Sequence, residues 1–247
     1  MPVSDLTNSA QDYLKLIWTA TEWSTTPITV TVLAERMGVR PSTVSDSIKK
    51  LKDQGLLTHA PYGTIELTPA GSAHAVDMVR RHRLLETFLV QVLGYGWDEV
   101  HDEAEVLEHA VSDTMIERID QHLGHPTRDP HGDPIPSADG QPHRPGAIQL
   151  GHAEPISEVT VVRISDADPA MLRYFSDIGL TPDAQLTIHQ QRPYTDTTTI
   201  TLSGQQKNID LGPAASSAVW VTTSLINSRH GQEHIVETTT GESSARK

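Results

Sequence analysis

Residues 29–51 read TVTVLAERMGVRPSTVSDSIKKL, and this stretch predicts two helices joined by a tight turn. Gly38 follows the first helix, at a point where a residue without Cβ permits the left-handed backbone of a turn. Pro41 begins the second helix, at a position where its missing N–H is not needed. The residues that we expect the first helix to bury are Val32, Leu33 and Met37. The pattern is typical of a helix-turn-helix.

The second helix of this motif has an apolar face and a polar face. Val44, Ile48 and Leu51 recur at the i, i+4 and i+7 spacing of a buried face. The other face carries short hydroxyl side chains, which allow close approach to DNA, and long cations, which reach phosphates. The side chains that we expect to contact DNA are Arg40, Ser42, Thr43, Ser45, Asp46, Lys49 and Lys50. Asp46 either accepts a hydrogen bond from a cytosine amino group or faces solvent, and the pattern favours neither.

Two short apolar runs follow the second helix. They cover residues 56–58 and 65–67 and flank the turn Pro61-Tyr62-Gly63, which predicts a two-stranded wing. A helix-turn-helix also serves as a packing unit in some proteins, and a wing also contacts proteins. The order of helix, glycine turn, small-polar helix and wing nevertheless favours double-stranded DNA as the partner.

Charge is distributed unevenly along the chain. The net charge of −13 over 247 residues argues against a nucleic-acid partner, because binding to phosphates rests on Lys and Arg. Residues 1–60, however, hold six basic and six acidic side chains, and four of these six cations fall between Arg40 and Lys52. The absence of cysteine excludes disulfide frameworks, thiolate zinc sites, iron–sulfur clusters and cysteine nucleophiles. One local basic face on an acidic body is compatible with DNA.

The remainder of the chain divides into segments that differ in composition and in the spacing of their apolar residues. A helical segment follows the wing, then a stretch rich in Pro, Gly and His, and then short runs that alternate apolar and polar residues as strands do. The helical sequence PAMLRYFSDIG lies among these strands. We expect a winged helix-turn-helix over 1–74, a helical domain over 75–141, a linker over 142–155, a small barrel over 156–224 and a disordered tail over 225–247.

This order of elements predicts a mainly α fold with small β parts, of the α+β class. The N-terminus has no basic region and no apolar core of the kind that a signal peptide needs. No stretch approaches the length of about 18 apolar residues that spans a membrane. We therefore expect a cytoplasmic protein without a membrane partner.

The stretch VHDEAEVLEHAVSDTM, residues 100–115, combines metal-ligand side chains with a helical apolar stripe. On a helical wheel, four side chains fall beside the stripe within an arc of about 100°: His101, Glu105, Glu108 and His109. Carboxylates and imidazoles at the edge of a buried seam repel one another or lose hydration unless a cation lies among them. The pattern predicts a metal site.

A second pair of ligand-type side chains precedes this stretch. His82 and Glu86, in RRHRLLETFL, are four residues apart and share one face of a helix. Alone, such a pair is typical of a hydrogen-bonded surface pair, but the nearby cluster favours a metal. Nitrogen and hard oxygen ligands without sulfur suit Mn²⁺, Fe²⁺, Co²⁺ or Zn²⁺, and spacing does not choose among these ions.

The winged helix, followed by VRRHRLLETFL, VHDEAEVLEHAVSD and HPTRDPHGDPIP, resembles the diphtheria toxin repressor family of metal-activated transcriptional repressors. The resemblance covers about residues 6–224. It implies an N-terminal winged helix-turn-helix, a helical domain for metal binding and dimerisation, and a C-terminal SH3-like β-barrel of the kind seen in iron-transport accessory proteins. The implied partners are operator DNA and a second copy of the chain.

The resemblance implies two metal sites. The primary site corresponds to Asp12, Glu105, Glu108 and His109. The second site corresponds to His82, Glu86 and His101, with an oxygen ligand from the barrel, here Asp168. The chain departs from the family at Lys15, where short manganese regulators can carry a second carboxylate. It departs again at Met171, where iron-responding members have a glutamine.

The resemblance also bears on the identity of the metal. Iron-responding members of the family have a methionine and a cysteine at the positions of Asp12 and Glu105. This chain has carboxylates at both positions, as the manganese-responding branch does, and hard oxygen ligands favour Mn²⁺. We expect Mn²⁺, with Fe²⁺ as the alternative and with Zn²⁺ or Co²⁺ as substitutes in vitro.

The expected function is a Mn²⁺-activated repressor of metal-homeostasis genes, not an enzyme, with no small organic substrate. An alternative from another class is a hydrolytic metalloenzyme that uses the His/Glu cluster, although Glu103, its candidate base, points away on the wheel. A third possibility is a DNA-binding protein that needs no metal. The histidines expected to be solvated or structural are His122, His125, His131, His143 and His152. Trp18 and Trp23 are expected in or near the core.

Overall fold

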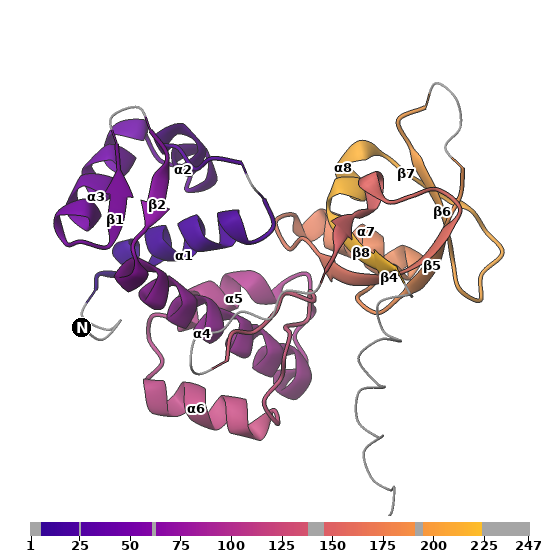
Figure 1. Cartoon of the computed structure of the whole chain (residues 1–247). Helices are drawn as coiled ribbons and strands as arrows, with labels where there is room; N and C mark the ends of the chain where they lie inside the picture. Colours follow the sequence, from indigo (N-terminus) through magenta and orange to yellow (C-terminus); the bar gives the residue numbers. More distant parts are fainter. Residues whose placement is uncertain (1–5, 25, 61–62, 138–145, 191–194, 224–247) are drawn as a thin grey trace, which may run out of the picture. The chain divides into compact units, whose positions relative to one another are not determined.

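The structure is a computed structural model that describes residues 6–24, 26–60, 63–137, 146–190 and 195–223 (Figure 1). Packing divides the chain into two compact units. The first contains residues 1–145 and 163–178, and the second contains residues 146–162 and 179–247. Four parts of the sequence prediction lie outside the described residues: the turn residues Pro61 and Tyr62, His143, the start of the linker, and the tail from residue 225 onward.

The first unit opens with three helices and a hairpin. Their bounds are α1 (Asn8–Glu22), α2 (Val30–Arg36), α3 (Pro41–Asp53), β1 (Leu57–His59) and β2 (Ile65–Leu67). The side chains of Thr7 and Thr29 accept backbone N–H groups and so cap α1 and α2. Gly38 has the positive φ of 64° that the turn between α2 and α3 requires. β1 and β2 pair antiparallel, with Leu57 opposite Leu67. The predicted winged helix-turn-helix is confirmed.

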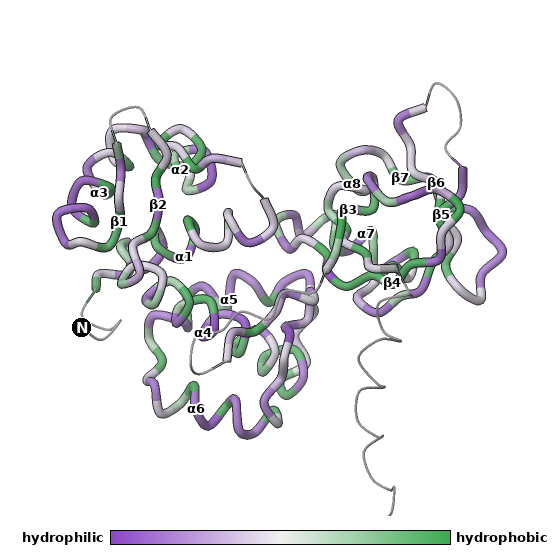
Figure 2. Tube along the Cα trace, in the orientation of Figure 1, coloured by the Kyte–Doolittle hydropathy of each residue, from purple (hydrophilic) through white to green (hydrophobic). Residues whose placement is uncertain are grey.

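One hydrophobic core joins α1 to the helix-turn-helix. Its buried side chains include Tyr13, Leu14, Ile17, Trp18, Leu33, Val44, Ile48 and Leu51. Val32 and Met37, which were expected in this core, are only partly buried, because the buried face of α2 is centred on Leu33 and Ala34. Figure 2 shows hydrophobic residues along β2 and hydrophilic residues over much of α3. Because α1 shares a core with α3, Asp12 on α1 belongs to the same packed body as the exposed face of α3.

The rest of the first unit is built on one long helix, α4 (Pro69–Leu93). It packs against α1, α5 (Val100–Leu107) and α6 (Asp113–His122). The side chain of Thr68 caps its start, and Gly94 ends it with a φ of 76°. The buried side chains of this core include Leu84, Leu85, Leu89, Val100, Ala104, Ile116 and Ile119. A further helix, α7 (Pro169–Ile178), follows β4 in sequence and falls within the first unit.

The predicted helix over residues 100–115 is broken in the structure. α5 ends at Leu107, and α6 begins at Asp113. Ser112 explains the break, because its side chain accepts the backbone N–H of Met115 and so caps a new helix. Met115, an apolar residue at the end of this stretch that the helical wheel places on the buried stripe, is exposed. The ligand candidates that follow Leu107 lie on a turn, not within one continuous helix.

The second unit contains a six-stranded sheet in the order β3-β8-β4-β5-β6-β7. The bounds of its elements are β3 (Ile148–Gln149), η2 (Leu150–His152), β4 (Ser157–Ile164), β5 (Gln185–Ile188), β6 (Thr198–Leu202), β7 (Ile209–Leu211), α8 (Pro213–Ser217) and β8 (Val219–Thr223). Val159 pairs with Leu186, which pairs with Leu202, so buried apolar residues align across three strands. The small β domain and the α+β class are confirmed. No helix in the described part of the chain is long and apolar enough to cross a membrane.

Candidate metal centre

Asp12, Glu108 and His109 meet although nearly a hundred residues separate the first from the others. Asp12 lies on α1, and the other two lie on the turn after α5. The Nε2 atom of His109 is 2.9 Å from Oδ1 of Asp12 and 3.6 Å from Oε1 of Glu108. One ligand atom from each residue lies within 4.8 Å of the other two. These three of the four predicted primary ligands form a compact donor set, which we call the primary cluster.

The hydrogen bonds around His109 orient its ring as a metal ligand needs. The side-chain amide of Gln11 donates from Nε2 to the carbonyl of Leu6, so its Oε1 atom accepts from Nδ1 of His109 at 2.7 Å. The Nε2 lone pair of the imidazole then faces Asp12. Metal-binding histidines are commonly held by a hydrogen bond from the other ring nitrogen in this way.

Asp12 carries a polar atom that the protein leaves unpaired. Its Oδ1 atom is buried and has no hydrogen-bond partner among the described residues. Burial raises the pKa of Asp12, although His109 and Lys15 act in the opposite direction. An unpaired buried carboxylate oxygen beside an imidazole lone pair is costly, and a cation between the two atoms removes that cost. The donor set therefore fits a divalent ion.

Glu105, the fourth predicted primary ligand, does not join Asp12 and His109 in this structure. Its Oε1 atom lies 2.6 Å from the Nζ atom of Lys15, which lies at the same distance from Oε1 of Glu108. Glu105 instead groups with His82 and Glu108 as possible ligands. An ammonium group thus occupies the space between two predicted ligands.

His82, Glu86, His101 and Asp166 form a second compact donor set, which we call the second cluster. The Oε1 atom of Glu86 is 3.0 Å from Nε2 of His82 and 3.4 Å from Nδ1 of His101. The same Nδ1 atom of His101 is 3.2 Å from Oδ2 of Asp166. All four residues belong to the first unit. The three predicted ligands from α4 and α5 are therefore brought together, with a carboxylate from the segment before α7.

That carboxylate is Asp166, whereas the sequence interpretation assigns the role to Asp168. Oδ1 of Asp168 accepts the backbone N–H groups of Ala170 and Met171, which occupies its carboxylate at the start of α7. A residue that caps a helix through its side chain is directed along its own chain. Asp166 is two residues earlier, clear of this cap, and its side chain reaches His101.

The second cluster is neutralised by its own imidazoles. Burial alone would lower the pKa of His82, but Glu86 and Glu108 raise it to about 9. His101 is held in the same way by Asp166 and Glu86, and its pKa is raised to about 11. The pKa of Glu86 is lowered, because the two histidines outweigh the effect of its burial. Without a cation, the cluster is a set of imidazolium–carboxylate ion pairs.

A third group, Glu86, Asp129 and His131, was not predicted from the sequence. His131, which was expected to be solvated or structural, is fully buried, and its ring stacks on Trp97. Against the effect of burial, Asp129 and Glu86 raise the pKa of the His131 ring. Its Nε2 atom bonds to the carbonyl of Trp97, and Nδ1 is the remaining ring nitrogen. The nearest carboxylate oxygen is Oε2 of Glu86, 3.9 Å away, and neither atom has a hydrogen-bond partner among the described residues.

Nδ1 of His131 and Oε2 of Glu86 are 3.9 Å apart, which is too far for a direct hydrogen bond. A cation between them suits this spacing better. Burial raises the pKa of Asp129 to about 8, and the neighbouring Asp133 and Glu86 act in the same direction. The signal in the sequence was the pair Asp129 and His131 within DPHG, two residues apart before a proline-rich stretch.

Buried ion pairs surround the clusters and join α1 to α4. Arg83 donates to Glu22 at the end of α1, at 2.5 and 3.0 Å, and lies 3.4 Å from Asp133. Trp23 was expected in or near the core; it is half-buried, and its indole N–H donates to the same Asp133 at 2.7 Å. Arg163 donates to Asp133 as well. The first unit thus carries a network of buried ion pairs and hydrogen bonds beside the ligands.

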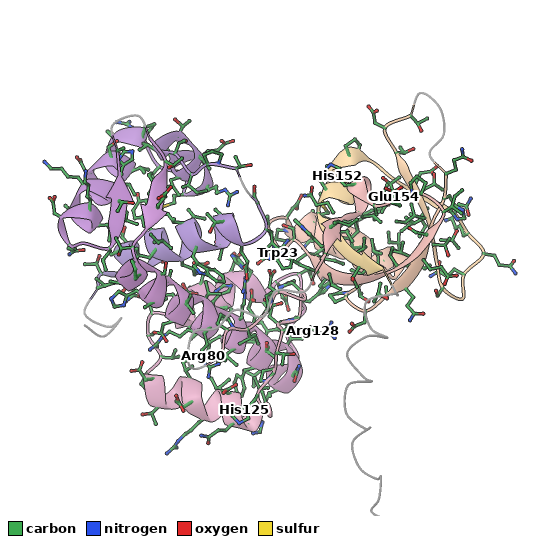
Figure 3. All side chains as sticks on the ribbon, in the orientation of Figure 1. Trp23, Arg80, His125, Arg128, His152 and Glu154 are labelled. Atoms are coloured by element: carbon green, nitrogen blue, oxygen red, sulfur yellow. The ribbon has the colours of Figure 1, made fainter. Side chains whose placement is uncertain are left out.

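His122, His125 and His152 were expected to be solvated or structural, and the structure agrees. His125 accompanies Arg80 at the carboxylate of Asp120, and Figure 3 shows Arg80 on α4 and His125 near the end of α6. His122 and His152 are exposed. None of these three belongs to a compact group of ligand atoms among the described residues.

The predicted DNA-contacting face of α3 is solvent-exposed along its length. The exposed members are Arg40, Ser42, Thr43, Ser45, Asp46, Lys49 and Lys50. The hydroxyl of Ser45 donates to the carbonyl of Pro41 within the helix, which leaves an oxygen lone pair outward. On the inner face, Val44, Ile48 and Leu51 are buried. The face is free to meet a partner, and DNA contact by these side chains stays a prediction.

Comparison with known families covers most of the chain. Residues 5–65 match the family described as "Iron dependent repressor, N-terminal DNA binding domain". Residues 68–137 match "Iron dependent repressor, metal binding and dimerisation domain", and residues 148–223 match the "FeoA domain". The three matches follow one another in the order of the elements described above.

Similar proteins include repressors named for iron and for manganese. The iron-dependent repressor IdeR of Mycobacterium tuberculosis (strain ATCC 25618 / H37Rv) is 32% identical over 199 residues, which cover 75% of this chain and 86% of IdeR. The diphtheria toxin repressor of Corynebacterium diphtheriae is 32% identical over 171 residues, covering 69% of this chain and 71% of that protein. A solved structure described as "Manganese-dependent transcriptional repressor complex with manganese" is 54% identical, covers 87% of this chain and 99% of its own, and has a TM-score of 0.83.

Proposed function

We propose a function from the premise that the chain belongs to the diphtheria toxin repressor family. Its relatives are metal-dependent repressors and not enzymes, and the protein is accordingly a metal-dependent transcriptional repressor. We propose further that Mn²⁺ activates it, that it acts as a cytoplasmic homodimer on operator DNA, and that it controls genes of metal homeostasis.

The observation that carries the proposal is the meeting of Asp12 with Glu108 and His109. Asp12 stands on the helix that shares a core with the helix-turn-helix, and the other two residues stand after α5, which packs on α4. These side chains are the donors of a site that reaches across two parts of the first unit. A divalent ion bound there supplies a partner to Oδ1 of Asp12, which has none among the described residues.

The chain's own residues explain how binding at this site would change DNA affinity. Without a metal ion, Lys15 offsets the charge of Glu108, but Oδ1 of Asp12 has no hydrogen-bond partner among the described residues. This leaves α1 less firmly held against the turn after α5. With the charges balanced, α1 and the helix-turn-helix that packs on it hold one orientation. In a homodimer, that orientation fixes the spacing of two α3 helices to successive major grooves. Metal acts by favouring the binding-competent conformer.

The donor set supports Mn²⁺ as the physiological ion. The primary cluster offers carboxylate oxygens and one imidazole and no sulfur, a set that suits a hard ion such as Mn²⁺. The similar repressor of solved structure is named for manganese, whereas IdeR is named for iron. Fe²⁺ is the alternative that the experiment below compares directly, and Zn²⁺ or Co²⁺ is expected to substitute in vitro.

The second cluster is proposed to take another ion, held by Glu86. One side of Glu86 faces His82, His101 and Asp166, and the other faces Asp129 and His131. We propose Asp166 in place of Asp168 as the carboxylate from the segment before α7. Because this cluster lies on α4, α5 and the segment before α7, it does not include the helix-turn-helix, and we assign it a supporting role.

The proposal is tested by DNA binding at defined concentrations of free metal. Fluorescence anisotropy would follow a duplex selected in vitro for binding to the Mn²⁺-loaded protein, with Mn²⁺, Fe²⁺ and Zn²⁺ compared. The Asp12→Ala variant should lose the metal-dependent gain in affinity, which for allosteric coupling is about 5- to 150-fold. The matched control is Asp102→Ala, which removes an exposed carboxylate on α5 that belongs to no cluster of the described residues.

Two results would contradict the proposal. One is an undiminished Mn²⁺ response in Asp12→Ala. The other is DNA binding by the wild-type chain that persists unchanged in a chelator. A response to Fe²⁺ alone would leave the assignment as a metal-dependent repressor intact and would make Fe²⁺, instead of Mn²⁺, the activating ion.

The DNA-contacting face has a separate test. Replacing Lys49 with Ala should weaken binding to all DNA sequences and reduce its salt dependence by about one phosphate contact. Mn²⁺ affinity, measured by calorimetry without DNA, should not change. Loss of metal affinity with intact DNA binding would mean that α3 is not the DNA-reading helix.

A further inference from the structure

Lys15 lies at the centre of the carboxylates that the proposed function assigns to metal. It stands on α1, three residues after Asp12, and its side chain is only 11% exposed. Its Nζ atom is 2.6 Å from Oε1 of Glu105 and 2.6 Å from Oε1 of Glu108. The side chain of Glu108 is fully buried. The buried ammonium of Lys15 thus bridges two carboxylates that follow it in the sequence by about ninety residues.

The charges around Lys15 keep it protonated. Burial works against the ammonium, but Glu108 and Glu105 outweigh burial and raise the pKa of Lys15. The second oxygen of Glu108 is also taken, because Oε2 lies 2.6 Å from Nδ1 of His82. Glu108 therefore meets a nitrogen partner on each of its oxygens, and one of these partners is a permanent cation.

The oxygen that the ammonium holds is the one that faces the primary cluster. Oε1 of Glu108 lies 3.6 Å from Nε2 of His109, and it is the same atom that bonds to Lys15. A metal ion bound by Asp12, Glu108 and His109 and the Lys15 ammonium therefore draw on one carboxylate oxygen. Both cannot use it fully, because a carboxylate shared between two cations attracts each one less.

We propose that Lys15 is a tethered competitor of the metal: its ammonium neutralises Glu105 and Glu108, and a divalent ion must displace it from Glu108 to bind. The inference rests on the proposed function of the primary cluster. The consequence is a threshold, since the lysine lowers metal affinity and so raises the concentration of free ion at which the repressor responds.

The structure also provides a place for the displaced ammonium. A cavity of about 440 Å³ in the first unit is lined by Lys15 together with the carboxylates of Asp12, Glu22 and Glu105. Because the side chain of Lys15 is long and flexible, its head can remain in this acidic pocket, still bonded to Glu105, after it leaves Glu108. The displaced ammonium thus has an acidic pocket in which to remain.

The test compares Mn²⁺ binding by the full-length wild type and by Lys15→Met, using isothermal titration calorimetry after removal of metal with a chelator. Lys15→Met retains the length of the side chain and removes the charge. We expect it to bind Mn²⁺ at least about fivefold tighter, the effect of one unit charge at about 4 Å in water. Metal-free Lys15→Met should also melt at a lower temperature than the wild type, because Glu108 loses a buried partner.

Three further variants make the comparison specific. Lys15→Arg keeps the charge and should bind Mn²⁺ with near wild-type affinity. Lys207→Met, an exposed lysine of the second unit, removes one charge from the chain and should leave Mn²⁺ affinity unchanged. If Lys15→Met does not fold, Lys15→Gln removes the charge while keeping a hydrogen-bond donor, and the same fivefold gain is expected.

The two possible failures are distinguishable. Wild-type protein that binds no Mn²⁺ overturns the proposed function and this inference together. Wild-type protein that binds Mn²⁺, with Lys15→Met binding equally or more weakly, overturns this inference alone.

Discussion

The primary cluster and the second cluster contain similar residue types but balance their charges in opposite ways. In the second cluster, His82 and His101 pair with Glu86, and the pKa of each histidine is raised. In the primary cluster, Oδ1 of Asp12 has no partner among the described residues, and burial raises the pKa of its carboxyl. The second cluster is thus a set of ion pairs, whereas the primary cluster contains a buried oxygen of Asp12 that has no hydrogen-bond partner among the described residues.

This difference separates two roles for a bound ion. At the primary cluster, a cation relieves an unpaired oxygen and connects α1 to the turn after α5, so binding there changes the joint that positions the helix-turn-helix. At the second cluster, a cation must displace protons from His82 and His101 before it binds. Metal sensing is therefore expected mainly at the primary cluster, and sensitivity to pH mainly at the second.

The largest expected effect comes from comparing two histidines of the same stretch. His109→Ala removes a ligand from the primary cluster and should abolish the metal-dependent gain in DNA affinity, about 5- to 150-fold. His101→Ala removes a ligand from the second cluster and should retain most of that gain. DNA-binding titrations with and without Mn²⁺ measure both. Equal losses in the two variants would remove the distinction between the clusters.

A smaller effect distinguishes Asp166 from Asp168. Asp166→Ala should weaken Mn²⁺ binding at the second cluster by at least about tenfold, the lower limit seen when even an outer partner of a metal ligand is removed. Asp168→Ala should leave metal affinity unchanged and cost about 1 kcal/mol of stability, because it removes the hydrogen bonds that cap α7. Calorimetry with Mn²⁺ and thermal unfolding separate the two outcomes. The opposite assignment would follow if Asp168→Ala weakened metal binding and Asp166→Ala did not.

The smallest effect is a dependence of stability on pH. The pKa of His82 is raised from 6.5 to about 9 in the folded protein, so its ion pairs stabilise the fold fully below pH 6.5. That contribution is lost as the pH rises through about 9. The melting temperature of the chelator-treated protein should therefore fall between pH 6.5 and 9, by about 2–4 °C for each kcal/mol lost.

Two measurements check that His82 causes this fall of the melting temperature with pH. In His82→Gln, the fall in melting temperature over the same pH range should be smaller, because no histidine is left at this position to release its proton. Mn²⁺ affinity at the second cluster should rise over that range, since the ligands must be deprotonated. A wild-type melting temperature that is constant or rises between pH 6.5 and 9 would contradict the claim that the ion pairs of His82 stabilise the fold.

The winged helix-turn-helix and most ligand candidates were accessible from the sequence because their signals are local. The spacing of Val44, Ile48 and Leu51 specifies the buried face of α3, and Gly38 specifies the turn before it. His82 and Glu86 share a helix face by their separation alone. Periodicity decides such features within a few turns of chain.

Other features depended on contacts between distant residues or on helix caps, and apolar periodicity reveals neither. The pairing of Lys15 with Glu105 and Glu108 joins α1 to residues about ninety positions later. The choice of Asp166 over Asp168 depended on which carboxylate is used to cap α7. The helical wheel over residues 100–115 overlooked the cap at Ser112, a local signal outweighed by the apolar periodicity.

The most direct test is the position of the ion itself. Crystals of the protein bound to its selected DNA duplex, grown with Mn²⁺, would be measured at a wavelength where manganese scatters anomalously. We predict an anomalous peak in contact with Asp12, Glu108 and His109. A DNA complex whose map shows no manganese among these three side chains would contradict the claim that metal joins α1 to the turn after α5.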